Sequence, residues 1–311
     1  MPDIDLTNAI FSDEDKAREH LEAQRWPDGV SCPFCGSVDA ISPLQGASMG
    51  PGWYHCNSCR DKFTVRVGSV MERSHIPFTK WALAFHLMCA SKKGVSAKQM
   101  QRMLGFKSYK SAWFICHRIR EAMKPDAKAG PLGGPGKVLE SDETFVGGKA
   151  KNAHKNKPVP PKRPVHALVE RGGQVRASHV PDVTAKTLAA ALEKIADKRS
   201  KLKTDDSLAN LSIGKDFADH QTVAHTLGEY VGKDGETHTQ TVESFFAIIK
   251  RGINGSFHSV SEQHLQRYVE EFAFRWNNRS ALGIEDTERA SRAIKGAVGR
   301  RLTYRQPHNT D

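Results

Sequence analysis

The segment from His238 to His258 predicts an amphipathic helix that carries one carboxylate. Apolar side chains recur at i, i+3, i+4 and i+7, the spacing of a buried stripe: Val242, Phe245, Phe246 and Ile249. The neighbouring stripe holds Gln240, Glu243, Ala247 and Lys250. In that position Glu243 is well placed to hold a metal ion, and Lys250 to meet a phosphate. On the helix alone an ordinary solvated glutamate is the better explanation, and the rest of the chain reverses this preference.

Two more carboxylates lie in predicted strands upstream. A strand from Val138 to Gly148 carries Asp142, and a short strand from Leu202 ends in Asp205. Between them we expect a hairpin, with strands at 165–169 and 174–180, and a helix from 184 to 198; a strand-like stretch at 222–231 follows. This is the element order of an RNase H-like fold, an α/β fold with a mixed sheet and flanking helices. That fold brings the three acids to one side of the sheet.

Four of the six cysteines form two Cys-x2-Cys pairs with twenty residues between them: Cys32, Cys35, Cys56 and Cys59. Two such pairs supply four thiolates for a tetrahedral zinc ion with no position left for substrate, so we expect a structural zinc ribbon. Four unrelated reduced cysteines would rarely repeat this spacing, and a redox site needs only one pair. After the second pair, 61–67 predicts a strand. Cys89 and Cys116 lie in apolar helical stretches and are expected in the core.

The bulk composition points to an anionic partner and away from membranes. The chain has 311 residues, 46 Lys and Arg against 35 Asp and Glu, and a formal charge of +11. No apolar run approaches the roughly 20 residues of a membrane span. The N-terminus is acidic, unlike the basic start of a signal peptide. We therefore expect a cytoplasmic protein with cysteines that are not disulfide-bonded.

Between the ribbon and the acidic region, residues 77–125 predict three helices. The first runs from Phe78 to Lys92, the second follows the capping residue Ser96, and the third follows Ser108. The buried stripe of the third is Ala112, Ile115, Cys116, Ile119 and Met123. The last two helices resemble a helix-turn-helix with basic side chains that would meet DNA phosphates: Lys107, Lys110, Arg118 and Arg120. The alternative is an ordinary three-helix packing unit with a charged face.

Three sequence stretches resemble the transposases of the IS1595 insertion-sequence family, the ISXO2-like group. They are Glu140-Ser-Asp-Glu-Thr-Phe-Val-Gly-Gly-Lys149, Lys203-Thr-Asp205 and His238-Thr-Gln-Thr-Val-Glu-Ser-Phe-Phe246. The stretch from Arg25 to Gly36 resembles that family's zinc ribbon, and the stretch from Gly255 to Asn278 resembles the helix after the catalytic one. The resemblance extends over roughly Phe11 to Arg279.

The resemblance implies a DDE-type DNA transposase whose first two metal-binding acids are Asp142 and Asp205. At the third position the family often has Asn, followed three residues later by Glu; this chain has Gln240 and keeps Glu243. Either residue can complete the site, and we favour Glu243 because a hard divalent cation prefers a charged oxygen. Asp206 is a rival to Asp205, because the residues after the second Asp depart from the family pattern.

The implied chemistry accounts for these residue types. Phosphodiester cleavage and strand transfer need an activated oxygen, from water or a 3′-hydroxyl, and a neutralised leaving oxygen. Two Mg²⁺ or Mn²⁺ ions about 3.5–4 Å apart supply both, with Asp142 between them. Lys250 would position a phosphate, and His238 would flank the site; for His225 a structural role is preferred. Glu140 shares the strand face of Asp142 and is expected near the site, whereas Glu143 is expected to point away and to be structural or exposed.

The sequence therefore divides into five segments. They are an N-terminal helical segment (1–30), a zinc ribbon (31–70), the helix-turn-helix-like region (77–125), the RNase H-like DDE transposase domain (137–280) and a basic C-terminal tail (281–311), disordered or adding DNA affinity. The stretch 149–163 is expected to be a mobile basic loop that orders on DNA, or a solvated loop without a partner.

The function predicted from the sequence is that of an insertion-sequence transposase acting on double-stranded DNA, at the terminal inverted repeats and at the target. The resemblance also implies association with the bacterial nucleoid. Pairing two DNA ends requires at least two subunits, so we expect a homo-oligomer on DNA. One alternative is a catalytically inactive DNA-binding protein that uses the ribbon and helix-turn-helix, such as a domesticated transposase or a regulator. A structure-specific nuclease on the same fold is another. The set Asp142, Asp205, Glu243 and Lys250 favours the transposase, because a regulator has no need of it.

Overall fold

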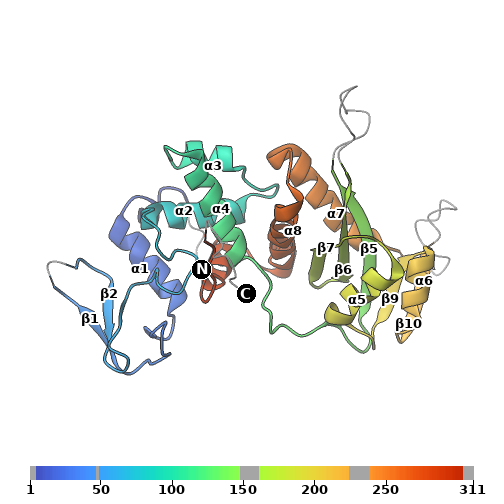
Figure 1. The fold of residues 1–311 in the computed structure, drawn as a ribbon, viewed down its shortest axis with the longest axis horizontal. Coiled ribbons are helices and arrows are strands. Elements are labelled where there is room, and N and C mark those ends of the chain that lie inside the picture. Colours follow the sequence, from blue (N-terminus) through green and yellow to red (C-terminus); the bar gives the residue numbers. More distant parts are fainter. Residues whose placement is uncertain (1–4, 47–48, 148–160, 224–237, 304–311) are drawn as a thin grey trace, which may run out of the picture. The chain divides into compact units, whose positions relative to one another are not determined.

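The computed structural model describes residues 5–46, 49–147, 161–223 and 238–303 (Figure 1). The chain divides into two compact units. The first combines Met1–Lys124 with Asn278–Asp311, and the second is Pro125–Asn277. Within the described ranges no helix has the length and apolar character that crossing a bilayer requires. Two predicted segments fall partly outside the described residues. They are the loop expected at 149–163, up to residue 160, and the strand-like stretch at 222–231, from residue 224 on. His225 also lies outside the described residues.

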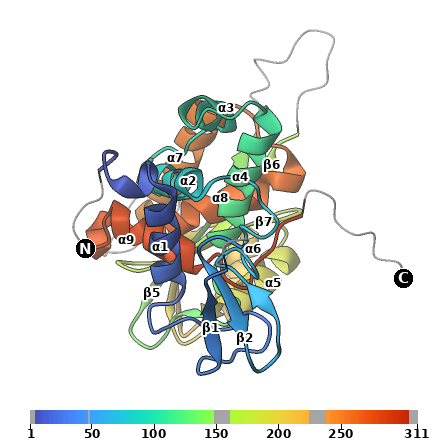
Figure 2. The ribbon, with the colours of Figure 1, turned by 90° about the vertical axis from the view of Figure 1, so that its left-hand side faces the viewer.

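The first unit begins with a 3-10 turn, helix α1 and a small antiparallel sheet of three strands. The 3-10 turn is Ala9–Phe11, α1 is Glu14–Arg25, and the strands are β1 (Ile41–Leu44), β2 (Trp53–Cys56) and β3 (Lys62–Phe63) in the order β1-β2-β3. Figure 2 shows β1 and β2 next to α1. The strand expected at 61–67 is therefore shorter than predicted. The segment 64–67 turns back instead, with Val67 N donating to the carbonyl of Thr64.

The three helices expected at 77–125 are confirmed. They are α2 (Phe78–Ala90), α3 (Ala97–Met103) and α4 (Tyr109–Ala122). Ser96 and Ser108 accept backbone N–H bonds as the caps of α3 and α4, which fixes where both helices start. The predicted apolar stripe of α4 is buried, and so are Cys89 and Cys116.

The segment expected to be a basic tail differs from its prediction. Residues Ser280–Leu282 form a 3-10 turn and Asp286–Lys295 form helix α9, which packs on α2 and α1. Small and apolar side chains at i, i+3, i+4 and i+7 make its buried stripe: Thr287, Ala290, Ser291 and Ile294. The expectation of a disordered tail was wrong for this helix: Arg292 and Lys295 are exposed, whereas Arg289 is buried beside the stripe.

The second unit is built on a five-stranded mixed sheet in the order β10-β9-β5-β6-β7. The strands are β5 (Val138–Val146), β6 (Arg163–Glu170), β7 (Val175–His179), β9 (Lys201–Asp205) and β10 (Asp219–Val223). β5, β6 and β7 are antiparallel neighbours, whereas β9 runs parallel to both β5 and β10. Two short strands, β4 (Leu132–Gly133) and β8 (Ala196–Asp197), form a separate parallel pair.

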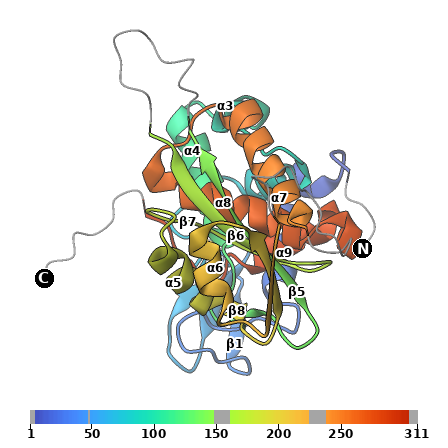
Figure 3. The ribbon, with the colours of Figure 1, turned by 90° about the vertical axis from the view of Figure 1, so that its right-hand side faces the viewer.

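Helices cover both faces of this sheet (Figures 1 and 3). On one face, α5 (Ala185–Ile195) and α6 (Leu208–Gly214) enclose a core that includes Leu139 and Leu168. On the other face, α7 (Gln240–Gly252), a π-helical turn (Ile253–Phe257) and α8 (Glu262–Asn277) enclose a core that includes Val165 and Ala167. The helix expected at 184–198 ends at Ile195 because the chain then enters β8, and α6 was not predicted.

Candidate metal centre and acidic site

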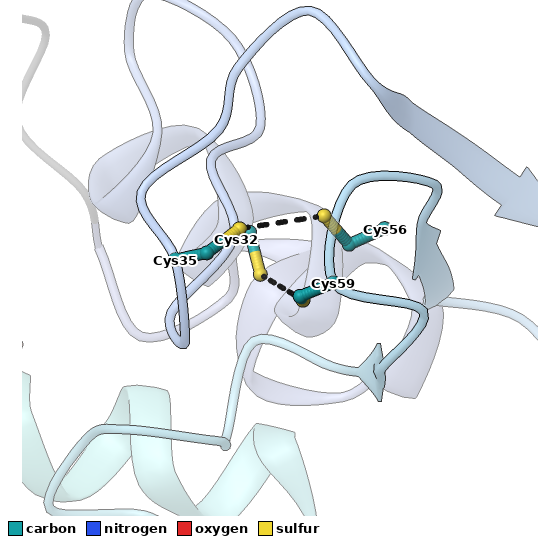
Figure 4. A group of neighbouring side chains, drawn as sticks. All are labelled: Cys32, Cys35, Cys56 and Cys59. Carbon is teal, nitrogen blue, oxygen red and sulfur yellow. Dashed lines mark hydrogen bonds between the residues drawn. The ribbon is translucent and has the colours of Figure 1, made fainter.

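The four cysteines of the ribbon converge on one point (Figure 4). Their sulfur atoms all lie within 4.8 Å of one another, and the Cys32–Cys59 and Cys35–Cys56 Sγ distances are both 3.6 Å. Two thiolates held about 2.3 Å from a tetrahedral zinc ion are about 3.8 Å apart, so this spacing fits zinc. The backbone N–H of Cys59 is the largest cause that lowers the pKa of the Cys56 thiol, to about 6, so this thiol loses its proton first. Burial and the neighbouring thiols raise the pKa of Cys59.

The two cysteine knuckles have the same backbone geometry. Gly36 N donates to the carbonyl of Cys32, and Arg60 N donates to the carbonyl of Cys56. The residue after each second cysteine is left-handed, with φ of +77° at Gly36 and +65° at Arg60. Glycine adopts this conformation freely, whereas arginine does so at a cost. The ribbon therefore carries strain in its second knuckle.

Aromatic rings close the ribbon against the end of α1. Trp26 makes edge contacts with Tyr54 and Phe63, which stack on each other at 5.7 Å. The hydroxyl of Tyr54 donates to Glu22 of α1 (3.1 Å). Burial is the first cause that raises the pKa of Tyr54, to about 12, with the charge of Glu22 second. These contacts fix the two knuckles relative to the helix.

Asp142 and Asp205 lie on neighbouring parallel strands of the second unit. Glu140 of β5 pairs with Lys203 of β9, and the two acids stand two residues further along their strands. Because side chains alternate along a strand, each acid points to the same face as its predecessor in the pair. Asp142 also pairs with Ala167, which belongs to the core under α7 and α8. The two acids therefore share the face of the sheet that α7 covers.

Asp205 is held by the start of the next helix. Its Oδ1 accepts from the side-chain amide of Asn210 (2.6 Å) and from the backbone N–H of Ser207 (3.2 Å). Ser207 is the cap of α6, the helix that was not predicted, and Asn210 is buried. Asp205 still pairs with Val223 in the sheet, whereas Asp206 follows the end of the strand. Pairing in the strand thus determines the side of the sheet to which Asp205 points. Asp206 lies outside the strand, so alternation does not determine its direction.

Glu243, Gln240 and Lys250 all lie on the exposed side of α7, as the predicted stripe requires. Helix α7 packs on β5 and β6 through its buried stripe. Glu243 accepts a hydrogen bond from the hydroxyl of Thr239 (3.2 Å). Among the residues that the structure describes, the four cysteines are the one group of three or more potential ligands gathered closely enough to hold a metal ion. Asp142, Asp205 and Glu243 do not form such a group.

Glu143 is not exposed, so of the two roles expected for it the structural one stays a prediction. It is half-buried, and its Oε1 is buried without a hydrogen-bond partner. Burial raises its pKa to about 8, and the charges of Asp142 and Asp205 add to the rise. Glu143 is thus electrostatically coupled to both acids. The strand alternation placed it on the opposite face and so concealed this coupling.

Glu140 and His238 lie beside the start of α7. Glu140 is fully buried and accepts hydrogen bonds from Arg171 and from the first turn of α7, and His238 Nδ1 is 3.5 Å from its Oε1. The expectation that Glu140 lies near the acids is consistent with its place two residues before Asp142. Neither its contact with Arg171 nor its contact with α7 was predicted from the sequence.

The helix-turn-helix-like pair needs one correction. Lys107 and Lys110, which precede and open α4, are exposed. Arg118 and Arg120 are buried, with 9% and 2% of their surfaces exposed. Arg118 donates to the carbonyl of Glu72 (3.0 Å) and lies over the ring of Phe114. These two arginines stabilise the first unit, so their expected contact with DNA phosphates was wrong.

Comparisons with known proteins match both units. A family model described as the ISXO2-like transposase domain matches residues 131–277, and one described as the transposase zinc-ribbon domain matches residues 12–62. The chain is 28% identical over 283 residues to an "Uncharacterized protein in transposable element ISH50" of Halobacterium salinarum; the match covers 85% of this chain and 91% of that protein.

One solved structure is a distant match. It is the "CryoEM structure of simian T-cell lymphotropic virus intasome in complex with PP2A regulatory subunit B56 gamma", with a TM-score of 0.28 and 15% identity. The match covers 56% of this chain and 63%, less than two thirds, of that one.

Proposed function

Because the chain belongs to the IS1595 family of transposases, with an ISXO2-like domain and its zinc ribbon, we propose that it is a DDE-type DNA transposase. It binds the ends of its insertion sequence and catalyses metal-dependent cleavage and strand transfer on an RNase H-like domain. The sheet order β10-β9-β5-β6-β7, with three antiparallel and two parallel strands, supports that fold.

The observation that carries the proposal is the pairing of Glu140 with Lys203 on parallel strands. This register supports Asp142 and Asp205 as neighbours on one face of the sheet, under the helix that bears Glu243. Carboxylate oxygens are the ligands that hard divalent cations prefer, so the donor set fits Mg²⁺ or Mn²⁺. The raised pKa of Glu143, to which Asp142 and Asp205 both contribute, is the signature of such an acidic cluster.

Each residue has a proposed role. Asp142, Asp205 and Glu243 bind the cations, which activate the attacking oxygen and stabilise the leaving oxygen when bound. Glu243 rather than Gln240 completes the set, because its carboxylate is charged. It lies about one helical turn beyond Gln240 on the exposed side of α7. Lys250, two turns beyond Glu243, contacts a DNA phosphate as a point charge.

DNA binding is assigned to the first unit and to the net charge of the chain. Lys107 and Lys110 are exposed next to the turn between α3 and α4, and the whole chain carries +11. Zinc supports the fold of the ribbon and takes no part in the chemistry, because four cysteines fill a tetrahedral site. Two DNA ends require at least two active subunits, so the working state is a homo-oligomer on DNA.

The test is cleavage of a labelled duplex that carries the element's own ends, in Mg²⁺ or Mn²⁺. Wild-type protein is compared with Asp142→Ala, Glu243→Ala and Gln240→Ala. We expect nicking at the ends that is lost in the first two variants and kept in the third. Loss with Gln240→Ala but not with Glu243→Ala would move the third ligand to Gln240. Tight binding without cleavage in either metal would contradict the enzyme and favour a DNA-binding regulator.

A further inference from the structure

We infer that Glu140 is a positioning residue that ties the helix of Glu243 to the strand of Asp142. The inference rests on the proposed function and adds a residue to it. Glu140 has none of its surface exposed, so its carboxylate has no access to DNA or to bulk solvent. A fully buried carboxylate is stable only where several donors surround it. The identity of those donors indicates what it holds in place.

Hydrogen bonds converge on Glu140 from two directions. Three come from the first turn of α7: the backbone N–H of Thr241 (2.8 Å), its hydroxyl (2.8 Å) and the backbone N–H of Val242 (3.1 Å). Another comes from Arg171, whose Nε donates at 2.6 Å. Arg171 also donates from Nη2 to the carbonyl of His238 (3.0 Å), just before α7. The carboxylate and guanidinium together hold the start of the helix.

Helix α7 depends on this distant carboxylate because its local cap is incomplete. His238 Nδ1 accepts a long hydrogen bond from the backbone N–H of Gln240 (3.4 Å), whereas the N–H groups of Thr241 and Val242 donate to Glu140. The N-cap residue of α7, Thr239, makes no side-chain bond to the helix backbone. The Thr239 hydroxyl donates to Glu243 Oε1 instead (3.2 Å). The group that would ordinarily satisfy the free N–H groups of the first turn is thus used to orient the third acid. Glu140 caps the N–H groups of Thr241 and Val242 from strand β5.

Glu140 lies close to the two elements that carry the first and third acids. It stands two residues before Asp142 on the same strand face, and Thr241 stands two residues before Glu243. A single buried carboxylate therefore joins the backbones that carry the first and third acids. Metal sites demand ligand placement within about 0.5 Å, so a shift of the first turn of α7 would weaken cation binding without unfolding the sheet.

The same chain provides a matched control. Helix α2 also begins without a side-chain cap at Pro77, and Glu14 of α1 accepts from the backbone N–H groups of Phe78 (2.6 Å) and Thr79 (3.1 Å). Glu14→Gln removes the charge of the carboxylate that caps α2 in the first unit. Glu140→Gln removes the charge of the carboxylate that caps α7 in the second unit. The two variants differ in whether the capped helix bears a proposed metal ligand.

The experiment measures Mn²⁺ binding to the zinc-loaded full-length protein by electron paramagnetic resonance, for wild type, Glu140→Gln, Glu14→Gln and Asp142→Asn. Hydrogen exchange of the peptide around Thr239–Phe246 is measured in parallel. We expect Glu140→Gln to weaken Mn²⁺ binding about 10- to 100-fold, the usual effect of removing the support of a metal ligand, and to speed exchange in that peptide. Glu14→Gln should leave Mn²⁺ binding unchanged. Thr241→Val, which removes one donor only, should weaken it less than Glu140→Gln and serves if the latter fails to fold.

The outcomes separate this inference from the proposed function. Suppose that Asp142→Asn abolishes Mn²⁺ binding, while Glu140→Gln and Thr241→Val fold and bind Mn²⁺ as tightly as wild type. Glu140 would then be merely structural, even if Glu140→Gln melts at a lower temperature, and the inference would be overturned. If Asp142→Asn binds Mn²⁺ as tightly as wild type, the acidic metal site itself is wrong, and the positioning role falls with it.

Discussion

Arg289 donates a hydrogen bond from Nη1 to the carbonyl oxygen of Cys89, 200 residues earlier in the chain (3.1 Å). Its other guanidinium nitrogens donate to the carbonyls of Asn278 and Ile284 (2.7 and 3.0 Å). The side chain is 7% exposed. One arginine near the C-terminus thus satisfies carbonyl groups from both parts of the first unit. These hydrogen bonds therefore join helix α2 to the C-terminal part of the first unit.

The first prediction concerns this arginine. Arg289→Ala leaves buried carbonyls without donors, so we expect it to lower the free energy of unfolding of the first unit by about 3–5 kcal/mol. Hydrogen exchange in α2, which contains Cys89, measures the loss. The control is Lys295→Ala, which removes an equal charge from the exposed side of the same helix and should change stability by less than about 0.5 kcal/mol. Equal protection in the two variants would contradict the role of Arg289.

The second prediction concerns zinc. Removal of zinc by a strong chelator should unfold residues 30–67, because four thiolates so close together repel one another without a cation. The five-stranded sheet should stay folded, because it has its own two-sided core. Hydrogen exchange before and after chelation reports each region separately. Loss of protection in β5 and β6 together with the ribbon would show that the two units are not independent.

The third prediction uses the matched knuckles. Arg60→Gly should raise the stability of the zinc-bound ribbon by about 1 kcal/mol, because glycine relieves the φ of +65°. Gly36→Ala should lower it by a similar amount; no atom lies within 4 Å of the added Cβ, so backbone strain alone acts. Competition with a zinc chelator measures both. Arg60→Ala is the control, because it removes the exposed side chain and keeps the strain; a gain equal to that of Arg60→Gly would refute the strain argument.

The fourth prediction concerns pH. His166 is fully buried, its Nε2 is 2.9 Å from the hydroxyl of Ser141, and burial lowers its pKa from 6.5 to about 4. Between these two values the unfolded chain binds a proton that the folded chain does not, so stability falls as the pH falls from 6.5 towards 4. The full loss, reached below pH 4, is roughly 3 kcal/mol.

Urea unfolding of wild type and His166→Gln across pH 4–7 tests this effect. The difference between the two proteins cancels the contributions of other titrating groups. Wild type should lose stability relative to the variant as the pH falls. Two parallel curves would mean that His166 does not titrate as its burial requires.

The sequence was sufficient to predict the elements that carry the proposed site residues. Cysteine spacing identified the ribbon, and alternation and helical periodicity located the strands of Asp142 and Asp205 and the helix of Glu243, because these patterns are local. Glu140 and Glu143 were understood less well. Alternation gives the face of a strand residue, but which helix it caps or which charges it meets depends on contacts about 100 residues away.

Charge was the least reliable signal. Arg118 and Arg120 were assigned to DNA by their charge, and both are buried. Residues 286–295 were assigned to a basic tail for the same reason, although Thr287, Ala290, Ser291 and Ile294 follow helical spacing. A stripe of small residues is a weak hydrophobic signal, and the positive charges beside it obscured it. The burial of Arg118, Arg120 and the stripe of α9 is determined by tertiary packing rather than by composition.

The last prediction follows from that correction and concerns DNA binding. Lys107 and Lys110 remain exposed beside the turn between α3 and α4, so of the four basic residues expected to contact DNA these two can reach phosphates. We expect Lys107→Ala/Lys110→Ala to weaken binding to any duplex and to reduce the salt slope of log K by about 2, roughly one unit for each phosphate that is no longer neutralised. Fluorescence anisotropy from about 50 to 200 mM salt measures the slope. The control is Lys186→Ala/Lys194→Ala on the exposed side of α5, which removes the same charge. An equal fall in slope for both pairs would mean that net charge alone, and not the helical pair, binds DNA.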